Sequence, residues 1–380
     1  MSVSIDDLPL EIIALILSDL DRASLLSVVR TARTLRPHAE RLLYRNIDLR
    51  RSSQRGAIAF LNTVIRNPRL GSLVYSFCPD AHYLRRQLKK FNDLIPDAVK
   101  SFPNLKTFVI GRQDDFHPEW LKMSSSQVTP FHLQHLSLHL PLGHTSSWDV
   151  VKFLLQVLQL QPSLLHIAVS LEDDDGWGSC ISESGVTDAL EMICPSLNTL
   201  EGTNAIIRLL LPKGHIKTLR WKCARQGLEP LRPVTDLETD SRLRDTFFTP
   251  RLCEAYGRLE HLTLSNQISL LPILSPYLSS LKTLELITIM IIDNPRPYPK
   301  HWDEALFLGA IGGMKHLEVL EVTWVGAALP RHDIDPKVIF ATCRNLKRFA
   351  IKKRSTAGTV YTADCMQRGT DGSAHYVAQV

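Results

Sequence analysis

A short apolar phrase returns along most of the chain and limits the fold more than any other feature of the sequence. The phrase consists of a turn residue, an apolar anchor, two variable residues, an apolar residue, a variable residue and another apolar residue. The clear copies span residues 103–110, 131–138, 162–169, 195–202, 214–221, 257–264, 279–286, 315–322 and 344–351. The alternating apolar positions that end each copy predict a short strand with one buried face.

These copies resemble the L-x-x-L-x-L core of leucine-rich repeats, in which each repeat adds one strand to a stacked solenoid. Successive anchors are separated by as few as 19 residues (Leu197 to Ile216) and as many as 43 (Ile216 to Leu259). A regular array keeps to about 20–29 residues per repeat. We therefore expect an irregular solenoid with a parallel sheet and outer helices or loops of unequal length. The candidate outer helices are residues 148–160, 186–193 and 302–311.

The two ends of the array are less regular than its middle. Residues 68–75 look like a weaker first copy, and residues 47–49 are expected to form a strand that leads into the array. The pattern is lost from Ser355 onward, where residues 359–363 and 375–380 are either capping strands or a ragged end. The predicted parts are a helical module at 1–50, an irregular array at 51–354 and a cap or tail at 355–380.

Apolar residues at helical spacing fill the first fifty positions and predict three short helices. Asp7, Asp21 and Thr34 are the expected caps, with Pro9 and Pro37 in the first turns of two of these helices. Three helices of this length cannot bury all of their apolar surface among themselves, and each exposed Leu or Ile forgoes roughly 1.5–3 kcal/mol. The stripe therefore packs on the rest of the chain or on a partner, and periodicity alone leaves both open.

The residue types of the stripe resemble the F-box consensus over about residues 5–49. Residues 8–13 read Leu-Pro-Leu-Glu-Ile-Ile, like its Leu-Pro-x-Glu start, and an apolar helix and a Val-Val-Arg centre follow. The tryptophan often found after that arginine is absent, with Leu35 near its place, although residues 33–39 resemble a known variant. Taken together, the F-box and leucine-rich-repeat resemblances imply a fold class of α/β, with a three-helix module ahead of the solenoid.

The resemblance also implies partners. The module would dock on a Skp-family adaptor and through it on a cullin scaffold, while the repeats hold an unidentified target protein for ubiquitin transfer. The implied adaptor contacts are Leu8, Pro9, Ile12, Ile13, Ile16 and Leu17. Leu25, Val28 and Val29 would extend this contact or hold the module together. The alternative is a repeat scaffold that binds partners without any link to ubiquitination.

Strand alternation places every second side chain of each copy on the exposed face of the array. These predicted target-face residues are His135, Ser137, Arg220, Lys222, His261, Thr263, Glu285, Glu321, Thr323, Arg348 and Lys352. Taken singly, each is most simply a solvated polar strand position. Together they form a natural docking surface, because a curved solenoid presents consecutive strands to one ligand. Their mixed charge indicates no ligand of a single sign.

No sequence motif indicates catalysis, a cofactor or a metal. His132, His135, His139 and His144 are the best metal candidates, but four strand residues at about 3.3 Å each place His135 and His139 roughly 13 Å apart, too far to share one zinc ion. The acidic run at 172–176 lacks the ligand spacing of a calcium-binding loop. We therefore expect a protein that is not an enzyme.

Composition and charge indicate which kinds of partner and which cellular compartment to expect. The formal charge of +5 is scattered, without a basic run, so we expect no nucleic-acid partner. The longest apolar run, residues 12–17, is too short to span a bilayer, so we expect no membrane association. Seven dispersed cysteines without CxxC spacing indicate reduced thiols and an intracellular protein, in the cytoplasm, the nucleus or both.

Overall fold

The computed structural model of this 380-residue chain describes most of its length. The described residues are 8–50, 52–79, 88–110, 131–140, 147–171, 194–222, 247–265, 270–289, 304–325, 335–354, 360–369 and 374–379. The chain divides into two compact units. The first unit contains residues 1–145 and 149–164, and the second contains residues 146–148 and 165–380.

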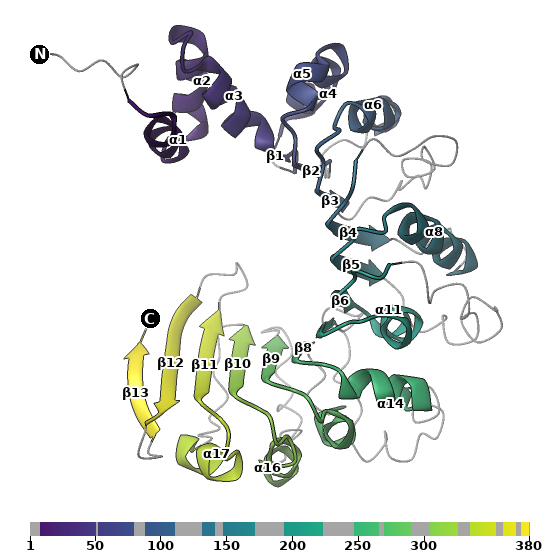
Figure 1. Ribbon diagram of the computed structural model, residues 1–380, viewed down its shortest axis with the longest axis vertical. Helices are drawn as coiled ribbons and strands as arrows, with labels where there is room; N and C mark the ends of the chain where they lie inside the picture. The colour runs from purple at the N-terminus through teal and green to yellow at the C-terminus, as the bar shows by residue number, and fades with distance from the viewer. Residues whose placement is uncertain are drawn as a thin grey trace, which may run out of the picture. The chain divides into compact units, whose positions relative to one another are not determined.

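The first unit begins with three short helices: α1 (Leu10–Ser18), α2 (Arg22–Thr31) and α3 (Arg36–Arg45) (Figure 1). The predicted cap of the second helix is confirmed, because the Asp21 carboxylate accepts a 2.8 Å hydrogen bond from the backbone N–H of Ser24. The predicted Thr34 cap is wrong. The N-cap of α3 is Leu35, which makes no side-chain cap bond and is buried among the helices, so burial rather than capping sets this start. Asp7 lies outside the described residues.

The strands of both units form an α/β structure dominated by parallel pairing. The first unit contains β1 (Asn46–Asp48), β2 (Ser76–Cys78), β3 (Thr107–Ile110) and β4 (His135–Leu140), which pair in parallel in this order. The second unit contains β5 (His166–Leu171), β6 (Thr199–Gly202), β7 (Thr218–Trp221), β8 (His261–Ser265), β9 (Thr283–Ile289), β10 (Val319–Val325), β11 (Arg348–Arg354), β12 (Val360–Arg368) and β13 (Ala374–Gln379).

Pairing in the second unit is parallel from β5 to β11 and antiparallel from β11 to β13. Equivalent positions of successive copies are aligned without a shift, as in Thr218 beside His261 and His261 beside Thr283. The two C-terminal segments left open by the sequence are therefore strands, and they close this edge of the parallel array.

Helices lie along one face of the strands in each unit, and the other face carries no helix among the described residues (Figure 1). In the first unit they are α4 (Gln54–Arg66), α5 (Pro68–Gly71), α6 (Leu88–Lys100) and α8 (Ser147–Leu160). In the second unit they are α11 (Asn204–Leu210), α14 (Pro250–Gly257), α15 (Leu271–Leu274), α16 (Glu304–Gly312) and α17 (Pro336–Thr342), with the 3₁₀ turns η3 (Leu211–Lys213) and η5 (Ser275–Tyr277).

Two of the predicted outer helices correspond to observed ones. Residues 148–160 and 302–311 correspond to α8 and α16, whereas residues 186–193 lie outside the described residues. The sequence did not single out the other helices. Several of these, such as α11 and α17, have only seven residues, too few to display a helical period. In the described part of the chain, no helix combines the length and apolarity needed to cross a bilayer.

Stacked apolar side chains from the repeated phrase form the core of each unit. The equivalent first inward residue of each strand from β2 to β11 is at most 2% exposed: Phe77, Phe108 and Leu136 in the first unit, and Ile167, Leu200, Leu219, Leu262, Leu284, Leu320 and Phe349 in the second. The anchors of the phrase, such as Leu105, Leu259 and Leu281, are also buried. Each copy thus completes the core of its neighbours.

The position of the first copy differs from the prediction for residues 68–75. Pro68 starts the helical turn α5, so Leu70 packs as part of that turn. Strand β2 begins at Ser76, which pairs with Thr107, and the residue equivalent to the anchor Leu105 is therefore Val74. A proline favours the first turn of a helix, and this preference shifted the strand four residues beyond the apparent phrase.

Candidate functional site

The helical module formed by α1, α2 and α3 has its own small core. Ile13, Leu17, Leu25, Leu35 and Ala39 are buried together. The partly buried side chains packed against this core are Leu8, Leu20, Val28, Val29, Ala32, Leu42 and Leu43. The module is therefore folded around an apolar centre, and burial distinguishes inner from outer positions along the same stripe.

One side of α1 leaves large apolar side chains at the surface. Ile12 is 43% exposed, Leu15 is 62% exposed and Ile16 is 41% exposed. A helix turns about 100° per residue, so these three point away from the side that carries Ile13 and Leu17. We call Ile12, Leu15 and Ile16 the apolar surface of α1. Leu10, at the start of the helix, and Leu26, on α2, are exposed as well.

The nine predicted adaptor residues thus fall into two groups. Pro9, Ile12 and Ile16 are exposed. The other six lie in the module core or pack against it: Leu8, Ile13, Leu17, Leu25, Val28 and Val29. The sequence prediction did not include Leu15, the most exposed of these side chains. Its position three residues after Ile12 was the available signal, because that spacing places both on one side of a helix.

Helix α3 attaches the module to the rest of the first unit. It ends at Arg45, and β1 begins at the next residue. The carboxylate of Glu40, which is buried, accepts from Arg36 Nε at 2.9 Å and from Arg69 Nη2 on α5 at 2.7 Å. Burial by itself would raise the pKa of Glu40, but the hydrogen bonds and charges of the two arginines outweigh it and hold the pKa below its usual value.

The predicted target-face residues of the second unit form cross-strand ion pairs and hydrogen bonds. Glu201 on β6, a residue that the sequence prediction missed, lies beside Arg220 at 3.5 Å and pairs with Lys222. Burial would raise the pKa of Glu201, whereas Lys222, Arg220 and His166 lower it and prevail. Glu201 could have been predicted from the sequence, because strand alternation places it on the outward face, as it does Arg220.

Similar contacts link the later strands. Glu321 on β10 pairs with Arg348 at 3.4 Å and with Lys352, both on β11. The Thr263 hydroxyl donates to Glu285 at 3.2 Å. His135 and His261 are exposed, and Ser137 is half-buried. His135 and Ser137 belong to the first unit, so the structure groups the other nine predicted residues in the second unit and leaves these two apart.

Thr323 departs from the expectation of an exposed side chain. It is on the outward face of β10 but is 0% exposed, and its hydroxyl has no hydrogen-bond partner in the described part of the chain. The residues in register on either side are Ile287 and Lys352, both with longer side chains. Strand alternation predicted the correct face for Thr323, but its solvent exposure depends on the neighbouring strands.

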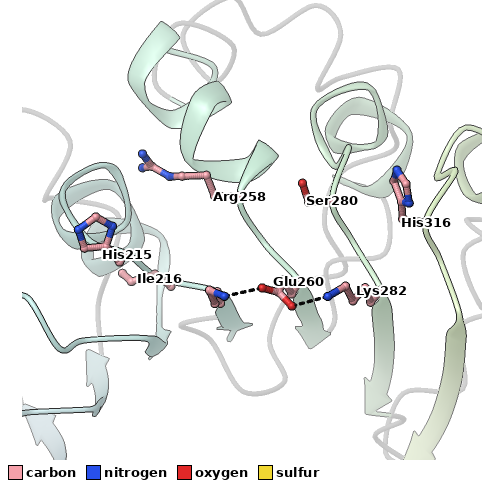
Figure 2. A pocket seen from close by; sticks show the side chains of 8 residues that line it. His215, Ile216, Arg258, Glu260, Ser280, Lys282 and His316 are labelled. Atoms are coloured by element: carbon pink, nitrogen blue, oxygen red, sulfur yellow. Dashed lines mark hydrogen bonds and ion pairs between the residues drawn. The ribbon is translucent and has the colours of Figure 1, made fainter.

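A groove runs along the start of four strands in the second unit (Figure 2). We call it the strand-start groove; its volume is about 490 Å³, and it is lined by His215, Ile216, Lys217, Arg258, Glu260, Ser280, Lys282 and His316. Glu260 lies between two lysines, with its carboxylate 2.7 Å from Lys217 Nζ and 2.7 Å from Lys282 Nζ. The hydrogen bonds from Lys217 and Lys282, together with their charges, lower the pKa of Glu260 to about 2.

The metal candidates that the sequence suggested lie partly within the described residues. Within the described ranges, no group of three or more His, Cys, Asp or Glu side chains could hold a metal ion. His132, His135 and His139 are among the described residues, and His144 and the acidic run 172–176 are outside them. The arrangement that is present suits binding, through one apolar helix surface and several polar strand positions.

Comparison with known proteins identifies the module. Residues 5–50 match the F-box-like family, and this stretch contains all of α1, α2 and α3. The chain therefore carries an F-box-like domain at its N-terminal end, followed by an α/β region with mainly parallel strands. A search of curated proteins gives no match to the chain.

Proposed function

We propose that this protein is the substrate-recognition subunit of a Skp–cullin–F-box ubiquitin ligase. In this proposal the apolar surface of α1 docks on a Skp-family adaptor, which connects the chain to a cullin scaffold. The strand region binds a target protein and presents it for ubiquitin transfer. Catalysis belongs to partner enzymes, and this chain contributes proximity and orientation.

The observation that carries the proposal is an exposed apolar surface on a module that already has a complete core. Ile12, Leu15 and Ile16 remain exposed although Ile13 and Leu17 are buried. Apolar side chains left half in water retain roughly 1 kcal/mol or more each that a partner can recover on binding. Their place within the F-box-like match supports an adaptor as that partner.

The alternative is a scaffold whose helical start merely packs on its own strand region. In the first unit, the module contacts the following elements through α3, with Glu40 bonded to Arg69 and the Tyr44 ring 6.1 Å from that of Phe60. The apolar surface of α1 takes no part in these contacts and stays exposed. Attachment through α3 with a free α1 surface favours the receptor over the scaffold.

We also propose that the strand region is an irregular leucine-rich-repeat solenoid. The support is threefold: the phrase recurs, its anchors are buried, and equivalent residues of neighbouring copies pair without a register shift. Repeats that bury their apolar face only against neighbours are typical of such arrays. The proposed target-binding face is the outward strand face, where Glu201, which pairs with Arg220 and Lys222, joins the predicted set.

Co-purification with a Skp-family adaptor tests the function. Full-length wild type should be captured, and Ile12→Asp/Ile16→Asp should weaken capture by about 100-fold or more, because two carboxylates would be buried at the contact. Both side chains are outside the module core, so circular dichroism should show an unchanged fold. The matched control is Leu306→Asp, which changes a 46% exposed leucine on α16 and should leave capture intact.

Absence of capture by a folded wild-type chain would contradict the receptor function and leave the scaffold. Equal loss in Leu306→Asp and in the α1 double variant would show that the apolar surface of α1 is not the contact.

A further inference from the structure

The strand-start groove is built from the same two positions of four successive copies of the phrase. The residues just before the anchors are His215, Arg258, Ser280 and His316, and all four side chains can donate hydrogen bonds. The residues just after the first three anchors are Lys217, Glu260 and Lys282. The groove therefore has one row of donors beside one row of alternating charges, all within the second unit.

The charge of Glu260 is satisfied inside the groove. Each of its carboxylate oxygens receives one lysine ammonium group, from Lys217 and Lys282 (Figure 2). The residues that line the groove include three cations, Lys217, Arg258 and Lys282, and this single carboxylate, so their net charge is +2 with neutral histidines. The lysine side chains remain 63% and 52% exposed, so they are accessible to a further anion.

Within the described residues, the other hydrogen-bond donors of the groove have either no partner or only a weak one. In the described part of the chain, the side chains of His215, Ser280 and His316 have no hydrogen-bond or ion-pair partner. Arg258 has only a 3.4 Å contact with Glu254, whose side chain is 74% exposed. An exposed pair of this kind contributes little to stability, and an incoming carboxylate can replace it.

The outward strand face differs in this respect. Its cations Arg220 and Lys222 are paired with Glu201, and Arg348 and Lys352 are paired with Glu321. The carboxylates are largely buried, at 14% and 15% exposure, while Arg220 and Lys222 remain 52% and 47% exposed, so each cluster has a net charge of +1. The strand-start groove, with a net charge of +2, has the larger excess of accessible positive charge.

The spacing of the groove suits a ligand in an extended conformation. Neighbouring strands are about 4.8 Å apart, so donors on four successive copies span roughly 14 Å. An extended peptide advances about 3.3 Å per residue and would cover this distance with four or five residues. Carboxylates along such a peptide could meet Arg258 and the two lysines, with backbone carbonyls accepting from the histidines and Ser280.

We propose that the strand-start groove binds an extended acidic segment, rich in Asp and Glu, of a partner protein. The site is separate from the apolar surface of α1 and from the outward strand face, so binding needs no adaptor. In a ubiquitin-ligase receptor the segment would belong to the target protein. Its contact with the groove would select for negative charge, which the mixed charges of the outward strand face do not.

The test uses the full-length chain and a fluorescein-labelled peptide of about ten glutamates in low salt, where screening is weak. Fluorescence anisotropy should show saturable binding that the corresponding glutamine peptide does not. Arg258→Glu should weaken binding about tenfold, because a carboxylate replaces a cation at the ligand. The matched control is Arg251→Glu, which makes the same change at an exposed position outside the groove, on α14, the helix that Arg258 follows, and it should weaken binding by less than about twofold.

A second variant acts in the opposite direction. Glu260→Gln removes the only carboxylate that lines the groove and frees both lysines, so it should strengthen binding of the glutamate peptide several-fold. A purely structural role of Glu260 would weaken binding instead. Because Glu260→Gln is expected to strengthen binding, the proposal stays testable even if Arg258→Glu folds poorly.

Equal binding of the glutamate and glutamine peptides would overturn the proposal, as would equal loss in Arg258→Glu and Arg251→Glu. Tighter binding of a single-stranded RNA of equal charge, lost in Arg258→Glu, would overturn the acidic segment in favour of a nucleic acid. Adaptor capture measured on the same preparations separates this result from the receptor function, because Arg258→Glu leaves the apolar surface of α1 unchanged.

Discussion

The helical module and the strand region use their apolar residues in opposite ways. In the module, a core of five residues holds three helices together, while Ile12, Leu15 and Ile16 remain at the surface. In the strand region, the first inward residue of each strand from β2 to β11 is almost completely buried, and polar side chains occupy many of the outward positions. The same residue type therefore signals a contact surface in one region and stability in the other, and only burial separates the two.

The largest expected effect tests the buried side of this comparison. Leu284→Ala should destabilise the protein by about 2–5 kcal/mol, because Leu284 is fully buried between Leu262 and Leu320 in adjacent strands. Urea unfolding measures the loss, and hydrogen exchange should increase in β8 and β10 as well as in β9, since neighbouring copies share one core. Leu15→Ala on α1 is the contrast and should cost about 0.5 kcal/mol or less. Similar losses of stability in Leu284→Ala and Leu15→Ala would contradict the distinction between buried core residues and exposed surface residues.

A smaller effect is expected at the attachment between the two regions. Glu40→Gln should destabilise the protein at neutral pH by about 1–3 kcal/mol, because a buried acceptor of two arginines loses its charge. The folded-state pKa of Glu40 is lowered, so its contribution is complete above the model-compound value of 4.5 and is lost as the pH falls through the folded pKa. The difference in urea midpoint between wild type and Glu40→Gln should therefore shrink between pH 7 and pH 3. A constant difference would show that the charge of Glu40 contributes nothing.

The smallest effects distinguish two threonines on the outward face. Thr323→Val should be neutral or stabilising by up to about 1 kcal/mol, because the buried Thr323 hydroxyl lacks a partner within the described residues. Thr263→Val should be destabilising by about 0.5–1.5 kcal/mol, because it removes the hydrogen bond to Glu285. Thermal unfolding of both variants gives the two signs. A loss of stability in Thr323→Val would mean that its hydroxyl is satisfied in solution.

Local rules accounted for much of this protein. The repeated phrase predicted the strands of nine copies, and helical spacing predicted the three helices of the module with Asp21 as one cap. These features depend on nearest neighbours along the chain, so periodicity and capping suffice. Resemblance of residues 8–13 to the F-box start pointed to the domain that the family match supports.

Features that depend on distant residues were beyond the sequence. The parallel pairing of Ser76 with Thr107 makes Val74, rather than Leu70, the residue equivalent to the anchor Leu105. The pairing of Glu40 with Arg69 joins residues 29 positions apart. Periodicity grouped Ile13 and Leu17 with Ile12 and Ile16, and only the packing of three helices separated core from surface.

The sequence by itself determined the strands of the nine clear copies, the three helices of the module and the outward direction of most predicted face residues, because each of these follows from side-chain periods of 2 and 3.6 residues. Tertiary structure alone decided which polar groups meet. The lysines and the carboxylate of the strand-start groove belong to separate copies of the phrase, and the anchors Ile216 and Leu259 are 43 positions apart. The parallel register of the strands brings these side chains together. Charge pairing across strands depends on that register, which no single stretch of sequence contains.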